Sequence, residues 1–298
     1  MSRIDYGALV LMADDGERIT ATVTGALRGP KKSLGNTVVV GDRVSLNWES
    51  DRAMIHAVAP RTGSFTRRAA GEREVPQVVA SGLDQVVVVG ALREPDFKAG
   101  LVDRVLVQCA HEGVSAYLAL NKVDLADAEE AQAVLAEYVQ AGVAGSALSA
   151  RDGSGVEEIR HVCAGRRSLF VGHSGVGKST LLSQLVPGVE LLAGEVNEKT
   201  GKGRHTTSHA LLLRLEDGTE LIDTPGVRAF ALWGVDSESL VEYYPELSPH
   251  LGSCRFGDCR HDREPGCSVR EAHASGGIGE RRWQSFLKLR AELAEGHH

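Results

Sequence analysis

The sequence predicts a multidomain chain with a small N-terminal β-barrel, a central α/β domain and a helical, metal-binding C-terminal domain. The first sixty or so residues contain short strand patterns separated by turn residues. Apolar strands then alternate with helical patterns as far as Leu185, which is typical of a parallel sheet with helices on both faces. Near the C-terminus, three cysteines and a histidine fall within fourteen residues. We expect a barrel over 1–62, a linker over 63–80, the α/β domain over 81–232 and the metal-binding domain over 233–296.

Length and composition limit the class of protein. The 298 residues are enough for two or three domains, and 42% hydrophobic with 24% charged residues is ordinary for a soluble globular protein. No apolar run approaches the roughly 18 residues of a membrane span, and Met1–Asp5 does not open a signal peptide. We therefore expect a cytoplasmic protein without a membrane partner, and a monomer is the default expectation. His297 and His298 resemble the start of a purification tag, so we do not expect them to belong to the fold.

The net charge of −7 argues against a globally basic nucleic-acid-binding protein, so RNA contacts would have to come from local patches. Strand patterns lie at 18–24, 37–48 (around a Gly-Asp turn) and 52–58, and the OB-fold is the commonest five-stranded candidate. Barrels of this kind often bind RNA. The basic side chains that could do so here are Arg28, Lys31, Lys32 and Arg43. A purely structural barrel with a solvated basic loop remains the alternative.

Residues 60–75 resemble a linker, because arginines stand there among glycine, serine and alanine with little to bury. Such a segment contacts phosphates when a partner orders it, or it is a solvated hinge. The α/β domain then opens with the apolar strand 85–89. Cys109 lies on the apolar face of a helical pattern, and it and Cys163 are predicted core residues. Residues 211–222 predict a hairpin that ends at Asp223.

A phosphate-binding loop organises this domain. Gly172–Ser179 has the pattern G-x-x-x-x-G-K-S, and it follows a short apolar run and precedes a helical one, as the motif requires. Its backbone N–H groups would surround the phosphates of a nucleoside triphosphate. Lys178 would reach the β- and γ-phosphates, and the Ser179 hydroxyl would hold Mg²⁺. The predicted nucleotide-binding residues of the loop are Gly172, Ser174, Gly175, Val176, Gly177, Lys178, Ser179 and Thr180.

Two upstream motifs indicate that the base is guanine. Asn121, Lys122 and Asp124 form an N-K-x-D tetrad at the end of a buried strand pattern. The Asp124 carboxylate can accept hydrogen bonds from guanine N1–H and the exocyclic amine, which adenine does not offer in that arrangement. Ser149 and Ala150 follow another short strand, as in the loop that supports the guanine ring.

Two segments downstream of the phosphate loop complete the set of nucleotide-binding motifs. Asp223–Gly226 has the pattern D-x-x-G after a strand, so Asp223 suits Mg²⁺ and the Gly226 N–H suits the γ-phosphate. Between this motif and the phosphate loop, Thr206 or Thr207 could complete the Mg²⁺ shell. These motifs together predict a GTPase that binds GTP and GDP. The guanine motifs come first, the phosphate loop second and the switches last, which is the order of a circularly permuted domain.

The late cluster predicts a zinc site. Its ligands would be Cys254, Cys259, His261 and Cys267. Zn²⁺ suits this Cys₃His set in tetrahedral geometry, and four protein ligands leave no open position, so one structural ion is expected. Free cysteines in a loop are the alternative. Residues 278–293 form an amphipathic helical pattern that we expect to dock onto the α/β domain.

The combination of a small barrel, a permuted G domain and the spacing C-x4-C-x-H-x5-C resembles the ribosome small-subunit-dependent GTPase A (RsgA) family over essentially the whole chain. The resemblance implies an N-terminal OB-fold and GTP hydrolysis stimulated by the small ribosomal subunit. It also implies a role in late maturation of that subunit, with contacts to its rRNA. The cofactors would be Mg²⁺ with GTP and one structural Zn²⁺.

Val227 stands where a Ras-like enzyme has the glutamine that orients the attacking water, so intrinsic turnover should be slow. The resemblance points to His205 as the water-positioning residue, acting beside Lys178 as the catalytic pair. The alternative for His205 is an RNA-contacting or solvated side chain. An alternative for the whole protein is a nucleotide-gated RNA-binding module whose hydrolysis is incidental. Another permuted ribosome-biogenesis GTPase is a further alternative.

Overall fold

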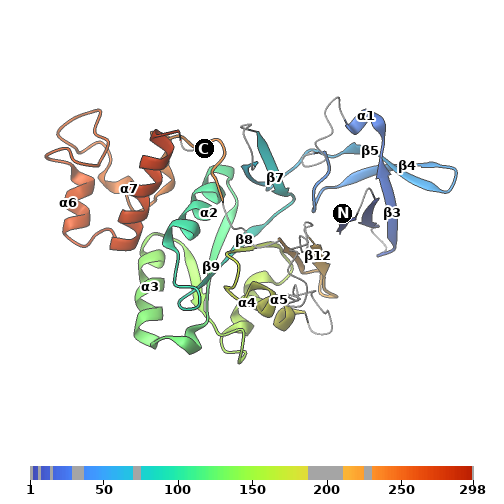
Figure 1. Cartoon of the computed structure of the whole chain (residues 1–298), viewed down its shortest axis with the longest axis horizontal. Coiled ribbons are helices and arrows are strands. Elements are labelled where there is room, and N and C mark those ends of the chain that lie inside the picture. Colours follow the sequence, from blue (N-terminus) through green and yellow to red (C-terminus); the bar gives the residue numbers. More distant parts are fainter. Residues whose placement is uncertain are drawn as a thin grey trace, which may run out of the picture.

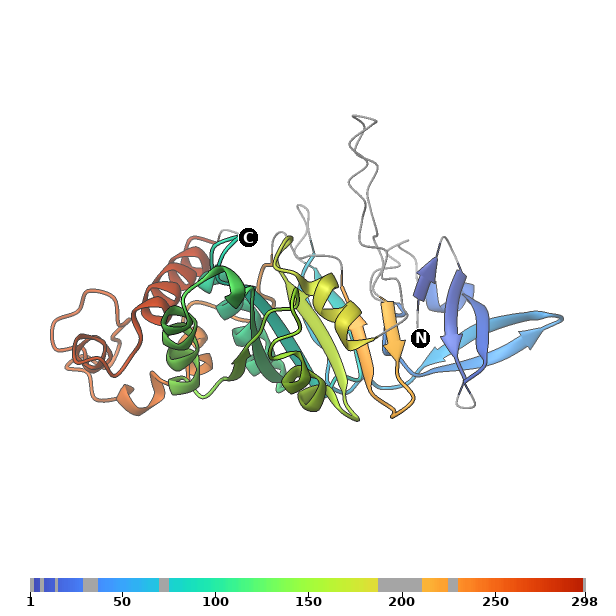
Figure 2. The same ribbon diagram turned by 90° about the horizontal axis from the view of Figure 1, so that it is seen from below.

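The structure is a computed structural model that describes residues 3–5, 8–13, 16–28, 37–69, 75–186, 211–224 and 230–296. The chain forms an elongated row of three parts (Figures 1 and 2). A strand-rich part lies at one end, an open sheet flanked by helices lies in the middle, and a mainly helical part lies at the other end.

The N-terminal part is a five-stranded sheet in the order β1-β2-β3-β5-β4. Its strands are β1 (Arg3–Asp5), β2 (Ala8–Met12), β3 (Arg18–Val23), β4 (Val44–Glu49) and β5 (Arg52–Val58), with a short helix α1 (Gly25–Arg28). β3 pairs with β5 in parallel and the other pairs are antiparallel, as in the five-stranded Greek-key arrangement of the predicted OB-fold. Alternate side chains such as Leu11, Ala21 and Ile55 form its core.

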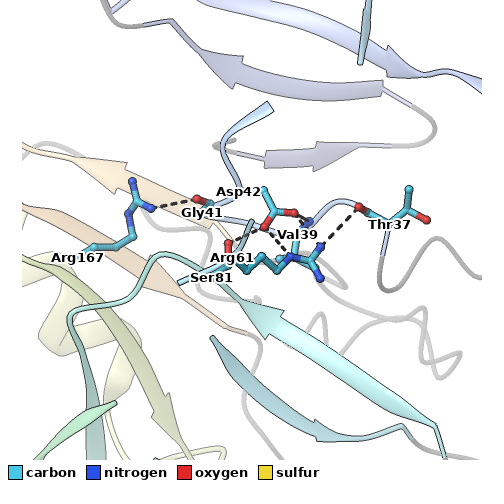
Figure 3. A network of polar contacts seen from close by, with 7 residues as sticks. All are labelled: Thr37, Val39, Gly41, Asp42, Arg61, Ser81 and Arg167. Atoms are coloured by element: carbon cyan, nitrogen blue, oxygen red, sulfur yellow. Dashed lines mark hydrogen bonds and ion pairs between the residues drawn. The ribbon is translucent and has the colours of Figure 1, made fainter. Parts of the chain in front are cut away.

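The predicted strand 37–48 is confirmed only from Val44 onward. Asp42 turns the chain before it, because its carboxylate accepts the Val39 N–H at 2.8 Å. The same buried carboxylate accepts the Arg61 Nε–H at 2.8 Å and the Ser81 hydroxyl at 2.6 Å (Figure 3). Arg167 of the central sheet donates to the Gly41 carbonyl at 3.0 Å. This network fastens the barrel to the central domain.

The predicted linker contains an ordered hairpin of β6 (Phe65–Arg68) and β7 (Pro76–Ala80). The expectation that little is buried there is wrong for Phe65, which is 1% exposed and stacks on Phe230 with ring centroids 5.3 Å apart. The Thr66 N–H donates to the Glu112 carboxylate at 2.9 Å. A single aromatic residue therefore anchors a segment whose composition resembles a hinge.

The central sheet has the order β10-β9-β8-β11-β13-β12, in which only the edge strand β12 is antiparallel to its neighbour. Two separate apolar cores lie on its two faces, as predicted for an α/β domain. Cys109 and Cys163 are each 1% exposed, which confirms their prediction as core residues. The strands are β8 (Gln85–Ala91), β9 (Ser115–Asn121), β10 (Ala144–Ala147), β11 (Arg167–Gly172), β12 (Leu211–Arg214) and β13 (Glu220–Asp223). The helices are α2 (Ala99–Glu112), η1 (Val123–Leu125), α3 (Ala128–Gln140), α4 (Val156–Cys163) and α5 (Lys178–Leu185).

Strand order reverses between β8 and β11, because the chain runs from β8 outward to β10 and then returns to the other side of β8. In open α/β sheets, ligands bind outside the carboxyl ends of the strands at such a reversal. The predicted β12–β13 hairpin is confirmed and ends at Asp223 on this same edge.

The C-terminal part comprises η2 (Ser239–Tyr243), η3 (Ser248–His250), α6 (Ser268–Ala274) and α7 (Glu280–Ala294). The predicted docking helix is α7, which packs beside α2 (Figure 1). Buried Arg282 donates to Asp103 of α2 at 2.6 Å and to Glu246 at 2.7 Å. Burial opposes the charge of Arg282, but Asp103 and Glu246 outweigh it and raise the pKa of the guanidinium. No helix among the described residues is both long and apolar enough to cross a membrane.

Candidate nucleotide and metal sites

The phosphate loop lies between the end of β11 and the start of α5. Gly175 and Gly177 have φ of +85° and +89°, a backbone region that glycine enters at little cost. A Cβ on Gly177 would lie 2.3 Å from the Asn121 amide nitrogen, so this position also has no room for a side chain. The loop is thus shaped for backbone approach to phosphate groups.

Lys178 is 7% exposed, and its ammonium donates to the Asp223 carboxylate and, at 2.5 Å, to the Thr224 carbonyl. The Thr224 hydroxyl in turn donates to the Phe170 carbonyl of β11 at 2.9 Å. Phe170 and Asp223 are opposite each other in the parallel register of β11 and β13. The structure therefore brings together Lys178 and Asp223, which the sequence placed in two separate motifs.

The guanine motif lies at the end of β9, on the same edge of the sheet, and β8 separates β9 from β11. Asn121 is 1% exposed and ends β9, Lys122 has a left-handed φ of +63°, and Asp124 is exposed in η1. The Asn121 amide donates to the Val176 carbonyl of the phosphate loop at 2.8 Å. Lys122 donates to the Glu94 carbonyl. The exposed Asp124 therefore lies in a segment that Asn121 connects to the phosphate loop by a hydrogen bond.

Ser149 and Ala150 are buried and lie next to this motif. The Ala150 N–H donates to the Asn121 side-chain oxygen at 2.9 Å, and the Ser149 N–H donates to the Ser154 carbonyl at 2.8 Å. The side chain of Asn121 therefore forms hydrogen bonds both to the loop that is predicted to support the base and to the phosphate loop.

Several predicted site residues lie outside the described residues, so their roles stay predictions. They are His205, Thr206, Thr207, Gly226 and Val227.

Two residues to which no motif assigns a role also reach this edge of the sheet. Lys98, which precedes α2, has its Nζ 3.2 Å from His173 Nε2, and His173 Nδ1 lies 2.7 Å from the Ser174 carbonyl. No role for His173 follows from the sequence, and nothing in the pattern around Lys98 indicates that it approaches the phosphate loop.

The predicted zinc ligands converge on one point. Ligand atoms of Cys254, Cys259, His261 and Cys267 all lie within 4.8 Å of one another. The Cys254 and Cys267 sulfurs are 4.0 Å apart, and they lie 3.5 and 3.4 Å from His261 Nδ1. Zn–S bonds of about 2.3 Å in tetrahedral geometry require ligand separations of this order, so the four residues fit a zinc ion.

Glu264 organises the loop that carries these ligands. Its carboxylate accepts the backbone N–H groups of Arg260, Asp262 and Arg263, each at 3.0 Å. Burial opposes the charge of this carboxylate, but the backbone hydrogen bonds prevail and lower the pKa of Glu264 to about 2. The loop is therefore held in shape around the cluster by a charged acceptor.

Comparison with known proteins agrees with this geometry. Residues 58–233 match the model of the RsgA GTPase family. The chain belongs to the RsgA GTPase family. The small ribosomal subunit biogenesis GTPase RsgA of Gemmatimonas aurantiaca is 38% identical over 290 residues, which cover 96% of this chain and 94% of the relative. The RsgA of Chlorobaculum tepidum is also 38% identical, over 99% of this chain and 97% of the relative.

Solved structures extend the likeness to the fold. YjeQ from Thermotoga maritima superposes with a TM-score of 0.74 at 28% identity and covers 98% of both chains. YloQ, described as a circularly permuted GTPase, superposes with a TM-score of 0.70 over 98% of this chain and 92% of its own, and at 21% identity it bears on the fold alone. The predicted family, the permuted order of the motifs and the assignment as a GTPase are confirmed.

Proposed function

We propose that this RsgA GTPase hydrolyses GTP during late maturation of the small ribosomal subunit and that the subunit stimulates the reaction. The RsgA relatives from G. aurantiaca and C. tepidum are named small ribosomal subunit biogenesis GTPases. The observation that carries the proposal is the meeting of Lys178, Asp223 and Asn121 at one edge of the sheet. We also propose that the protein acts as a monomer in the cytoplasm, where it contacts rRNA of the subunit.

At this edge, the phosphate loop would bind the phosphates through its backbone, and Lys178 would neutralise charge on the β- and γ-phosphates. Ser179 and Asp223 would hold Mg²⁺, with Thr206 or Thr207 as a third ligand. The ion would neutralise the phosphate charge that develops in the transition state. The Cys₃His cluster would hold one structural Zn²⁺.

The proposed guanine contact has a direct test. Asp124→Asn replaces one acceptor by an amide, which can accept from N1–H and donate to a carbonyl at position 2, the pattern of xanthine. We expect the variant to lose GTP hydrolysis and to hydrolyse xanthosine triphosphate. Equal activity of wild type and variant on GTP would remove Asp124 from the guanine site.

The proposed partner is tested by GTP hydrolysis of the purified protein alone, with small subunits and with large subunits. We expect slow basal turnover that only small subunits raise many-fold, because Val227 cannot orient water. We propose His205 as the residue that orients water once the subunit is bound. His205→Ala should abolish the stimulation, whereas His209→Ala in the same segment should retain it. Stimulation by large subunits alone would contradict the proposal.

Lys178→Ala distinguishes the enzyme from an RNA-binding module with incidental hydrolysis. In the module, RNA or subunit binding would continue largely unchanged in this variant. In the GTPase that we propose, GTP-dependent binding to the small subunit should be lost together with hydrolysis. Sedimentation with small subunits in the presence of GTP measures the difference.

A further inference from the structure

A second cavity lies beside the phosphate loop, between α2, β6 and α7. Its volume is about 540 Å³, which is within the range of pockets that hold small ligands. Of the phosphate-loop residues described above, it shares only His173, and Asn121, Lys178 and Ser179 do not line it. The cavity is therefore separate from the guanine-nucleotide site but adjacent to it.

Positive charge dominates the described lining of this cavity. The cationic side chains are Arg68, Lys98, Arg104 and Lys288. Glu292 is the one carboxylate among the described lining residues, and Arg104 forms an ion pair with it. The lining thus carries an excess of positive charge in a protein whose net charge is −7. A concave surface with one sign of charge concentrates oppositely charged ligands.

The same cavity also has an apolar wall. Its apolar members are Leu101, Phe230, Ala231, Leu232, Leu289 and Leu293. A free inorganic anion would make no apolar contacts with this wall, whereas the base or sugar of a nucleotide could pack against it. Pockets for small molecules commonly combine apolar walls with a few charged groups that fix orientation.

We propose that this cavity is a second phosphate-binding site, which takes a phosphorylated nucleoside as a free nucleotide or as one unit of an RNA chain. Lys98 and Lys288, both exposed, line the cavity from two different elements and would bind the phosphate, since one precedes α2 and the other lies on α7. Lys98 Nζ also lies 3.2 Å from Nε2 of His173 in the phosphate loop. A ligand bound to Lys98 would therefore lie next to that loop.

The test is a calorimetric titration of the full-length protein, saturated with GDP and Mg²⁺ so that the guanine site is filled. The probes are inorganic phosphate, adenosine monophosphate and a single-stranded RNA hexamer. We expect adenosine monophosphate or the hexamer to bind, more tightly than inorganic phosphate because each adds contacts to the apolar wall. Tighter binding of the hexamer identifies RNA as the source of the phosphate, and tighter binding of adenosine monophosphate identifies a free nucleotide.

Lys288→Glu and Lys98→Gln should each weaken binding at least tenfold. Arg52→Glu is the matched control for Lys288→Glu, because Arg52 is exposed on β5, does not line the cavity and undergoes the same change of charge. Absence of binding by all three probes, or equal affinity in wild type and both lysine variants, would overturn the proposal. The measurement uses neither ribosomes nor hydrolysis, so its failure is distinguishable from failure of the proposed function.

Discussion

The side chain of Asn121 connects to the main chain of Val176, 55 residues later, through a hydrogen bond of 2.8 Å. Its oxygen accepts the Ala150 N–H at 2.9 Å. One buried amide therefore fixes the guanine motif, the loop behind the base and the phosphate loop relative to one another. In the proposed site, recognition of the base and of the phosphates would be coupled through this single side chain.

We predict that Asn121→Ala weakens GDP binding at least tenfold. The substitution leaves the Val176 carbonyl and the Ala150 N–H without their partner, and each such loss costs about 1–3 kcal/mol in a buried setting. Titration with a fluorescent GDP analogue measures the change. Asn47→Ala, at an exposed position on β4, is the control and should bind GDP as the wild type does. Unchanged affinity in Asn121→Ala would show that the two loops hold their positions independently.

We predict that Arg282→Ala lowers the free energy of unfolding by about 3–5 kcal/mol, because it leaves the buried carboxyl groups of Asp103 and Glu246 without their cationic partner. The two side chains are 2% and 0% exposed. The neighbouring pair Arg281–Glu137 is partly exposed, so Arg281→Ala should cost at most about 1 kcal/mol. Unfolding in guanidinium chloride with zinc present compares the two variants. Equal losses of unfolding free energy in the two variants would mean that burial of the Arg282–Asp103 pair does not increase its contribution to stability.

The local chemistry of this protein is visible in its sequence, whereas its long-range contacts are not. The glycine conformations of the predicted phosphate loop and the convergence of the Cys₃His cluster follow from short patterns, because glycine conformations and ligand spacing are local properties. Phe65 and Phe230 stack although 165 residues separate them, and no periodicity in either segment indicates the other. The prediction that the linker buries little is wrong for Phe65 for this reason. The partnership of Arg282 with Asp103 was hidden in the same way, since charged residues on a helix usually face solvent.

We predict that Glu112→Gln stabilises the protein increasingly as the pH rises above about 4.5. Burial raises the pKa of Glu112 above its ordinary value of 4.5, more than the hydrogen bond from Thr66 lowers it. The folded state then binds more protons than the unfolded state, so wild-type stability falls as the pH rises through this window. The neutral amide still accepts from Thr66 but carries no charge to desolvate. Unfolding free energies of both proteins at pH 4, 5.5 and 7 give the difference, and a difference that does not grow with pH would contradict this account.

We predict that loss of zinc unfolds the ligand loop and α6 but leaves α7 in place. The loop has few apolar residues to bury and depends on its ligands, whereas α7 is held by Arg282 and by the core side chains Trp283 and Phe286. After chelation, amide hydrogen exchange should become fast over 254–274 and remain slow over 280–294.

Cys259→Ser should reproduce this pattern and reduce bound zinc from about one ion per chain to a small fraction, because a hydroxyl is a poor ligand for Zn²⁺. Cys163→Ser, which replaces a buried cysteine outside the cluster, should keep the full zinc content. Zinc retention in Cys259→Ser would contradict the assignment of this residue as a ligand, and equal loss of protection over 280–294 would show that α7 depends on the metal as well.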